Sequence, residues 1–305
     1  MSDLKIFRID GGMATELPGT DMALEKSLQT MIERNMETLF GVRFLASEYS
    51  TGINHGGRMD SVGIDENHSP VIFEYKRSTN ENVINQGLFY LNWLLDHRAE
   101  FQLLVMKQFG VQAAEAIDWR NPRLVCVAGG FTKYDTHAVQ QINHSIELVR
   151  YRDFSGQLLA LELVTATKGS STETVPAPTL KNSSSSPAKT VSDYLAQAPA
   201  TLQDLYAEFV AYCESLGDDV TQKATKLYFA FRRLKNFACV EVHPQTKILL
   251  VFLKIDPDTV DLALGFSRDV RNIGHFGTGD LEIRIRNRDE LAKALPLIER
   301  SYEAS

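Results

Sequence analysis

Residues 166–192 constrain the fold more than any other part of the sequence. Ser, Thr, Pro and Ala dominate this segment, and its large aliphatic residues are only Val175, Leu180 and Val191. Such a segment cannot bury enough apolar surface to offset the entropy that is lost on ordering. We therefore predict a flexible linker over residues 166–192, between a domain at 1–165 and a second domain at 193–305. The chain of 305 residues has the length of about two domains, at roughly 100–200 residues each.

The composition excludes several classes of protein. Hydrophobic residues make up 44% of the chain and charged residues 23%, which excludes a collagen-like, coiled-coil or wholly disordered chain. The net charge of -7 excludes a global polycation. Any contact with nucleic acid must therefore come from a local basic patch or through a metal ion.

The cysteines and the apolar runs indicate a cytoplasmic protein. Cys126, Cys213 and Cys239 have no CxxC spacing, and an odd number cannot form a complete disulfide framework. No stretch approaches the roughly 18 apolar residues of a membrane helix, and the first residues lack the pattern of a signal peptide. We expect a reducing compartment, no cysteine–zinc site and no membrane.

In the first domain, strand and helix patterns alternate. Gly11 and Gly12 predict a hairpin between two short β-rich runs, and apolar residues at helical spacing predict a helix over 21–40. Helices are further predicted at 81–96 and near 134–143, and strands at 42–49, 58–64, 71–76, 122–131, 146–154 and 158–164. This order predicts an α/β fold, a mixed sheet with helices on its faces.

The second domain has a different pattern. It begins with predicted helices at about 201–216 and 220–235, followed by strands at 237–242, 247–255 and 281–286. A closing helix is predicted over about 289–302. We expect a small α+β domain.

Three charged residues stand in two neighbouring β-rich runs. Asp60 lies in the run 58–64, and Glu74 and Lys76 lie in the run 71–76. Glu74 and Lys76 share one face because side chains alternate along a strand, and the short turn between the runs lets Asp60 come alongside Glu74. Two adjacent carboxylates repel each other unless a cation lies between them, and Mg²⁺ or Mn²⁺ suits such oxygen ligands. The pattern favours metal-assisted hydrolysis of a phosphodiester, in which Lys76 orients a water or stabilises a developing phosphorane charge.

A structural interpretation also stays open on these residues alone. Asp60 would then cap a turn, and Glu74 and Lys76 would form an ion pair on a solvated strand face. The run 71–76 is otherwise apolar, however, and charged residues within such a run are costly to bury unless they are paired or metal-bound.

Residues 22–165 resemble the PD-(D/E)XK nuclease superfamily, and within it the NucS and RecB-type branch. The stretch 57–60 (GRMD) is similar to the Gly-Arg-(Ile/Met)-Asp element of that branch, and 73–76 (FEYK) is similar to its ExK strand. Residues 86–94 (QGLFYLNWL) resemble its Gln- and Tyr-bearing helix, and 122–151 resemble its closing strand–helix–strand. The resemblance implies a restriction-endonuclease-like sheet and a nuclease activity that depends on Mg²⁺ or Mn²⁺.

The resemblance also implies roles for single residues. Asp60 and Glu74 would bind the metal, and Lys76 would be the catalytic lysine. Gln86 and Tyr90 are four residues apart and so lie on one helix face, where they would position the substrate or the lysine.

Further residues around this set are candidates. Glu25 in the first helix fits best as an additional metal ligand, whereas Glu33 and Glu37 are equally well explained as solvated helix charges. Arg58 and Arg77 are expected to contact nucleic acid, although a salt bridge explains Arg58 equally well. His55, in the loop before the GGRMD stretch, is interpreted as a bystander.

The chain departs from the family in one respect. NucS-type enzymes have a separate N-terminal DNA-binding and dimerisation domain, and here only about 20 residues precede the first helix. The preferred substrate of that branch therefore does not carry over. The first domain has a net charge of -6, which disfavours tight nonspecific DNA binding except through a metal. A homodimer is compatible with this fold class, but no sequence feature establishes one.

The second domain resembles a small C-terminal domain of unknown function, which supplies no activity. The resemblance is carried by 232–242, 268–285 and 295–303. Arg284 and Arg286 alternate on a predicted strand and so share a face, and with the basic residues of 223–235 they are candidates for nucleic-acid binding. The alternative is that these charges only solvate the surface.

The favoured hypothesis is a metal-dependent DNA endonuclease or exonuclease, with a role in repair or in defence. The second domain would then recruit the substrate or a protein partner through the linker. The second hypothesis is a binding module, in which a nuclease fold recognises nucleic acid or protein but catalyses no turnover. An enzyme that acts on RNA or on a nucleotide-like small molecule is a third.

Overall fold

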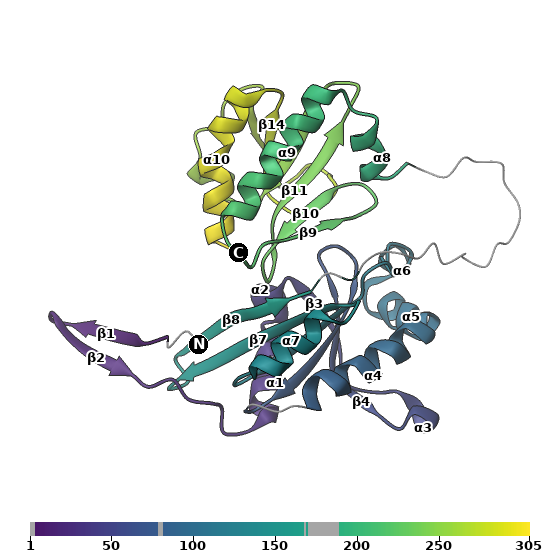
Figure 1. Ribbon diagram of the computed structural model, residues 1–305, viewed down its shortest axis with the longest axis vertical. Helices are drawn as coiled ribbons and strands as arrows, with labels where there is room; N and C mark the ends of the chain where they lie inside the picture. Colours follow the sequence, from purple (N-terminus) through teal and green to yellow (C-terminus); the bar gives the residue numbers. More distant parts are fainter. Residues whose placement is uncertain (1–3, 79–81, 168, 170–188) are drawn as a thin grey trace, which may run out of the picture. The chain divides into compact units, whose positions relative to one another are not determined.

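The computed structural model describes residues 4–78, 82–167, 169 and 189–305. The chain divides into two compact units, Met1–Ser171 and Thr172–Ser305, which are coloured purple to teal and green to yellow (Figure 1). Most of the predicted linker at 166–192 lies outside the described residues.

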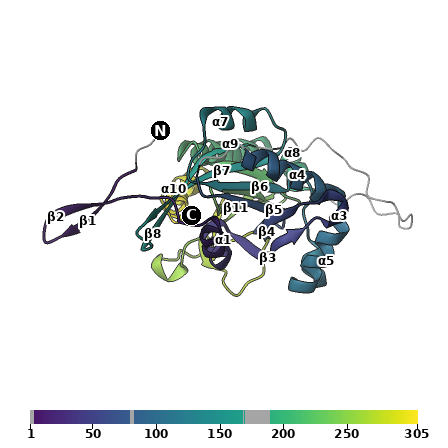
Figure 2. The same ribbon diagram turned by 90° about the horizontal axis from the view of Figure 1, so that it is seen from below.

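The first unit is built on a six-stranded mixed sheet in the order β3-β4-β5-β6-β7-β8, and Figure 2 shows the succession of β7, β6, β5, β4 and β3. Neighbours are antiparallel except for β5–β6 and β6–β7, which are parallel. The strands are β3 (Val42–Ser50), β4 (Arg58–Asp65), β5 (Pro70–Lys76), β6 (Arg123–Ala128), β7 (Ser145–Phe154) and β8 (Leu158–Ala166). A separate hairpin of β1 (Ile6–Asp10) and β2 (Met13–Leu17) precedes the sheet, as the sequence predicts.

Helices cover both faces of this sheet. Ile72 of β5 packs with Leu91 and Trp93 in one core cluster, and Phe73, which points the opposite way, packs edge to face on Phe40 at 5.1 Å. The helices are α1 (Glu25–Arg34), α2 (Met36–Phe40), α3 (Gly52–His55), α4 (Asn82–Asp96), α5 (Arg98–Phe109), α6 (Val111–Glu115) and α7 (Lys133–Gln140). The predicted mixed sheet flanked by helices is confirmed.

The helix predicted over 21–40 is shorter and interrupted. It begins at Glu25, and α1 gives way to α2 at Asn35. The Asn35 amide nitrogen donates to the carbonyl oxygen of Met31 at 2.8 Å, and such side-chain bonds to the backbone compete with a regular helix.

A buried arginine ties four strands together at one end of the sheet. Arg123, which is 2% exposed, donates to both carboxylate oxygens of Glu147 at 2.9 and 2.8 Å and to Asp65 at 3.0 Å. Asp65 also accepts the backbone N–H groups of Asn67 and Ser69 in the β4–β5 turn. These contacts fix the register of β4, β5, β6 and β7 relative to one another.

The second unit is an antiparallel six-stranded sheet in the order β13-β14-β12-β11-β10-β9. Phe209 of α9 and Ile298 of α10 pack in one core cluster with Phe231 and Val251 of the sheet, and Figure 1 shows these two helices next to each other. The elements are α8 (Val191–Ala196), α9 (Ala200–Ser215), β9 (Thr221–Ala224), β10 (Phe229–Arg232), β11 (Asn236–His243), β12 (Ile248–Leu253), a 3₁₀ turn at Pro257–Thr259, β13 (Ser267–Asp269), β14 (Leu281–Ile285) and α10 (Arg288–Glu303). The predicted α+β character is confirmed.

The helix predicted over 220–235 is wrong, because this segment forms β9 and β10. Phe229 and Phe231 face one core cluster and Tyr228 and Ala230 face another. A strand that is buried on both faces has no alternation of apolar and polar residues, so a short apolar run cannot be told from a buried helix. The basic residues of 223–235 therefore do not line one helix.

The cysteines and the helices of the described residues show two further properties. Cys126, Cys213 and Cys239 are buried, and none of them forms a disulfide among the described residues. Among the described residues, no helix combines the length and the apolar character that crossing a bilayer requires.

We expect Arg123→Met to lower the free energy of unfolding by about 3–5 kcal/mol, because Asp65 and Glu147 would be left buried without their partner. Chemical denaturation measures this change. Arg120→Met is the matched control. It removes a pair with Asp118 in which the Arg120 side chain is 41% exposed, and it should cost no more than about 1 kcal/mol. Equal losses of the free energy of unfolding in the two variants would contradict the stabilising role of the buried Arg123 contacts.

Candidate active site

The pairing of β4 with β5 brings two carboxylates together. The antiparallel register aligns Ser61 with Phe73, so Asp60 and Glu74 follow as neighbours across the strands. The Asp60 backbone N–H donates to Glu74 Oε1 at 3.3 Å, and the Tyr75 backbone N–H donates to Asp60 Oδ2 at 3.0 Å. Each carboxylate is thus held by the backbone of the opposite strand.

Glu74 lies in an environment that opposes its charge. The residue is 0% exposed, and burial, followed by the nearby Asp60 charge, raises the pKa of its carboxyl to about 9. Burial also raises the pKa of Asp60, although the Tyr75 N–H opposes this shift. Glu74 Oε2 is buried and has no hydrogen-bond partner among the described residues. The protein therefore supplies Glu74 with too few groups to stabilise a carboxylate.

This arrangement fits a hard divalent cation better than it fits two bare carboxylates. A cation at Glu74 Oε2 would satisfy the orphaned oxygen and neutralise the repulsion from Asp60. Among the described residues, no three His, Cys, Asp or Glu side chains are grouped closely enough to hold a metal. A site here has two protein carboxylates, and Mg²⁺ commonly keeps several waters beside one or two carboxylates. The metal itself stays a prediction.

Lys76 is paired with the acidic residue that begins α1. Lys76 Nζ lies 3.2 Å from Glu25 Oε1, and the Arg77 backbone N–H donates to Glu25 Oε2 at 3.3 Å. The Lys76 side chain is 16% exposed, whereas that of Glu25 is 43% exposed. In this arrangement Glu25 holds Lys76 in place, and its expected role as a metal ligand stays a prediction.

Tyr90 connects α4 to the strand that carries Asp60. Its hydroxyl accepts the Arg58 backbone N–H at 3.1 Å and lies 3.5 Å from Gln86 Nε2. A Cβ atom at Gly57 would lie 2.6 Å from the Tyr90 ring, so only glycine fits between the strand entry and this helix. Gln86 and Tyr90 therefore lie beside the site, and Tyr90 positions the start of β4.

Sequence reasoning missed a buried glutamine on α1. Gln29 Nε2 donates to the Asp60 carbonyl oxygen at 2.7 Å, to Glu33 Oε1 at 2.9 Å and to Ser47 Oγ at 3.1 Å. Glu33 in turn accepts the Ser61 hydroxyl at 2.6 Å. Glu33 thus supports β4 next to Asp60 rather than acting as a solvated charge, whereas Glu37 is exposed. A polar residue between Leu28 and Ile32, on the apolar side of the predicted helix, is the signal that points to Gln29.

The expected nucleic-acid contacts fall into two groups. Arg58 pairs with Glu48 at 2.5 Å and is largely exposed, and Arg77 is exposed with one bond to the Ala23 carbonyl oxygen. Both belong to the unit that carries Asp60 and Glu74.

Arg284 and Arg286 belong to the second unit. Arg284 pairs with Glu282 at 2.9 Å and Arg286 with Glu290 at 2.7 Å. Glu282 also pairs with Arg268 at 2.6 Å, and these pairs hold its pKa below the usual range against the effect of burial. Local acids thus neutralise much of this basic surface, and its role in binding stays a prediction.

Because the pKa of Glu74 is raised to about 9 from near 4.5 in the unfolded chain, the native state holds a proton that the unfolded state releases. In EDTA, the free energy of unfolding should fall by up to about 1.4 kcal/mol per pH unit as pH rises through this window. Denaturation of Glu74→Gln at pH 5, 7 and 9 should show this slope removed. The exposed Glu37→Gln should keep the wild-type slope. If Glu74→Gln keeps the wild-type dependence of the free energy of unfolding on pH, the slope does not come from the Glu74 carboxyl.

Comparisons with known proteins cover both units. The model of a family described as "Domain of unknown function (DUF5655)" matches residues 191–305, which confirms the predicted C-terminal domain of unknown function. An uncharacterized protein of Haemophilus influenzae is 28% identical over 313 residues, which cover 98% of this chain and all of that protein.

One solved structure, of an EndoMS–dsDNA2 complex, shows a weak likeness. It has a TM-score of 0.25 and 18% sequence identity, and the match covers 43% of this chain and 47% of that chain. The chain thus spans about half the length of that solved protein. The family comparison thus identifies a C-terminal domain without an assigned activity. The similarity to the protein solved with DNA is weak.

Proposed function

We propose that residues 1–165 form a metal-dependent nuclease domain that hydrolyses phosphodiester bonds in DNA. The observation that carries the proposal is the buried Glu74 Oε2, which lacks a hydrogen-bond partner among the described residues and lies in a carboxylate whose neighbour is Asp60. Buried polar atoms without a partner are few in native proteins, and a divalent cation would compensate both the oxygen and the pair of charges.

In the proposed reaction, the protein groups have distinct roles. Asp60 and Glu74 would hold Mg²⁺ or Mn²⁺, which supplies Lewis-acid polarisation of a phosphoryl oxygen when bound. The Lys76 ammonium, fixed by Glu25 at 3.2 Å, would donate a hydrogen bond to the attacking water or to a phosphoryl oxygen. Charge builds up on the phosphoryl oxygens as the water oxygen attacks phosphorus and releases a proton to solvent, and as the P–O bond breaks and the leaving oxygen takes up a proton from solvent. A positioned cation at Lys76 stabilises that charge.

DNA is the proposed substrate because of the match of the Asp60, Glu74 and Lys76 motifs to a nuclease family. Arg58 and Arg77 would contact phosphates beside these residues. The domain at 193–305 would recruit DNA or a protein partner through the linker at 166–192.

An alternative is a domain that binds nucleic acid or protein without turnover. Two contacts favour it. Lys76 is already engaged by Glu25, and Arg58 is already engaged by Glu48. In this case the fold would bind its partner and leave phosphodiester bonds intact.

The direct test is cleavage of labelled single-stranded, duplex, branched and mismatched DNA, and of RNA, with Mg²⁺ or Mn²⁺ and with EDTA. We expect cleavage that requires the metal. Glu74→Gln, Asp60→Asn and Lys76→Met should each lower the rate by at least about 10²-fold, since each removes a group that stabilises charge in the transition state.

The controls are chosen from exposed residues of the same unit. Glu37→Gln on α2 and Lys133→Met on α7 are exposed and should cut at the wild-type rate. Equal cutting by wild type and Glu74→Gln would contradict the proposal. Binding without cutting, with folding confirmed by denaturation, would support the alternative.

A further inference from the structure

Glu48 of β3 has a backbone conformation that is unusual within a strand. Its φ is 53°, in the left-handed region that residues other than glycine rarely adopt. The other described non-glycine residues with positive φ, His68, Ser155 and Lys247, lie in turns between strands. A strained conformation persists only where the surrounding contacts hold it, and such positions cluster at functional sites.

Glu48 lies next to the carboxylates of the candidate active site. The β3–β4 register pairs Ser47 with Ser61, so the adjacent residues, Glu48 and Asp60, lie across from each other on neighbouring strands. Burial raises the pKa of Asp60, and the nearby charges of Glu25 and Glu48 raise it further. Glu48 therefore belongs to the electrostatic surroundings of the site.

Two cations from different elements bind the Glu48 carboxylate. Lys26 Nζ of α1 lies 3.0 Å from Glu48 Oε1, and Arg58 Nε at the start of β4 lies 2.5 Å from Glu48 Oε2. The hydrogen bond from the Lys26 ammonium, helped by the Arg58 charge, holds the pKa of Glu48 below its usual range against the effect of burial. Glu48 is thus ionised at neutral pH, and each of its oxygens holds one cation.

The two cations are more exposed than the carboxylate between them. The side chains of Lys26 and Arg58 are 58% and 66% exposed, whereas that of Glu48 is 30% exposed. A ligand from solvent can therefore reach both cations without opening the fold. A phosphodiester presents two anionic oxygens on one atom, as a carboxylate does, and it pairs with guanidinium and ammonium groups in the same way.

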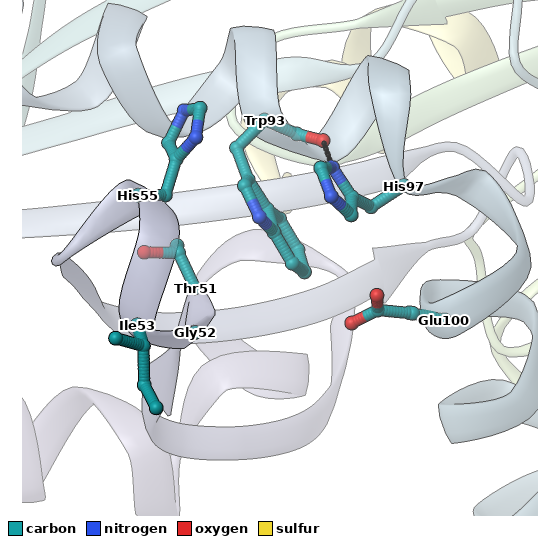
Figure 3. Close-up of a pocket in the computed structure, with 7 residues that line it drawn as sticks. All are labelled: Thr51, Gly52, Ile53, His55, Trp93, His97 and Glu100. Atoms are coloured by element: carbon teal, nitrogen blue, oxygen red, sulfur yellow. Dashed lines mark hydrogen bonds between the residues drawn. The ribbon is translucent and has the colours of Figure 1, made fainter.

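The backbone around Arg58 is fixed, so an exchange of partners needs only side-chain movement. The Thr51 hydroxyl donates to the Gly57 carbonyl oxygen and accepts the Gly57 N–H, each at 2.9 Å. The Tyr90 hydroxyl accepts the Arg58 N–H at 3.1 Å. Figure 3 shows Thr51 in the β3–β4 connection, and Trp93 of the helix that carries Tyr90, as two of the residues that line one pocket. These contacts hold the Arg58 backbone at a set place, two residues from Asp60.

We propose that Lys26 and Arg58 form a binding site for one backbone phosphate of DNA, and that Glu48 occupies this site in the free protein until the phosphate displaces it. This inference rests on the proposed function for the polymer that carries the phosphate. Glu48 competes for both cations, and its own charge repels the phosphate. Glu48 thereby limits how tightly the domain holds DNA, and the pair of Arg58 with Glu48 is the resting form of the phosphate site.

The test measures the binding of a short labelled DNA duplex to the full chain by fluorescence anisotropy, in EDTA to prevent metal-dependent cleavage. Glu48→Gln should bind about 5-fold more tightly than wild type, since it removes a competitor that is held by weak, exposed ion pairs. Lys26→Met and Arg58→Met should each weaken binding about 5–10-fold and lower the slope of log affinity against log salt by about 0.9. Glycine suits a positive φ, so Glu48→Gly should show the same tighter binding if Glu48→Gln does not fold.

Matched controls separate this site from the overall charge of the domain. Glu37→Gln on α2 and Arg34→Met in the last turn of α1 are exposed and make the same charge changes elsewhere. Each should alter the affinity by less than about 2-fold, because salt screens distant charges. In Lys26→Met/Arg58→Met, the further change Glu48→Gln should have no larger effect than Glu37→Gln, since its partners are absent.

The outcomes separate the phosphate site from the nuclease activity. An equal gain in affinity for Glu37→Gln and Glu48→Gln, a gain that persists without Lys26 and Arg58, or no binding by any of these proteins would overturn the proposal. Displacement of the duplex by inorganic phosphate at matched ionic strength would also overturn it, in favour of a site for small anions. Metal-dependent cleavage with unchanged binding in the Glu48, Lys26 and Arg58 variants would keep the nuclease and remove the phosphate site. The expected changes in binding, with no cleavage by wild type, would keep the phosphate site and remove the nuclease.

Discussion

The proposed chemistry of the first unit depends on a buried carboxylate, Glu74, whose Oε2 has no hydrogen-bond partner among the described residues. The same unit shows how a buried charge is satisfied. Arg123 is as deeply buried, and Glu147 and Asp65 meet its guanidinium with hydrogen bonds of 2.8–3.0 Å. Among the described residues, only the Asp60 N–H donates to Glu74, on one oxygen, and Glu74 lies beside a second acid. The contrast between the two ends of β5 distinguishes a structural ion network from the site at which we propose a cation.

Helix α4 connects the parts of the proposed site. It packs on the central strands through Leu91 and Trp93, and its Tyr90 hydroxyl holds the Arg58 N–H at the start of the strand that carries Asp60. Elements of this kind hold functional groups more accurately than loops do.

The sequence predicts the local features better than the contacts between them. The strands that carry Asp60 and Glu74, and the helix that carries Gln86 and Tyr90, follow from short patterns and are found where expected. The strand β10 was missed because it is apolar on both faces. The partners of Glu25 and Arg58 depend on side chains that meet only in the fold. The buried contacts of Gln29 and Arg123 join segments that are far apart in the sequence, and nothing local in the sequence names their partners.

Titration calorimetry of the metal-free chain with Mn²⁺ tests most directly whether Asp60 and Glu74 bind a divalent cation. At pH 7, titrations in buffers of different ionisation enthalpy should show one binding event that releases a proton, because the pKa of Glu74 is raised to about 9 and its carboxyl must deprotonate to bind. Glu74→Gln should abolish the event. Binding of Mn²⁺ by Glu74→Gln with the wild-type affinity, or no binding by the wild type, would contradict the account.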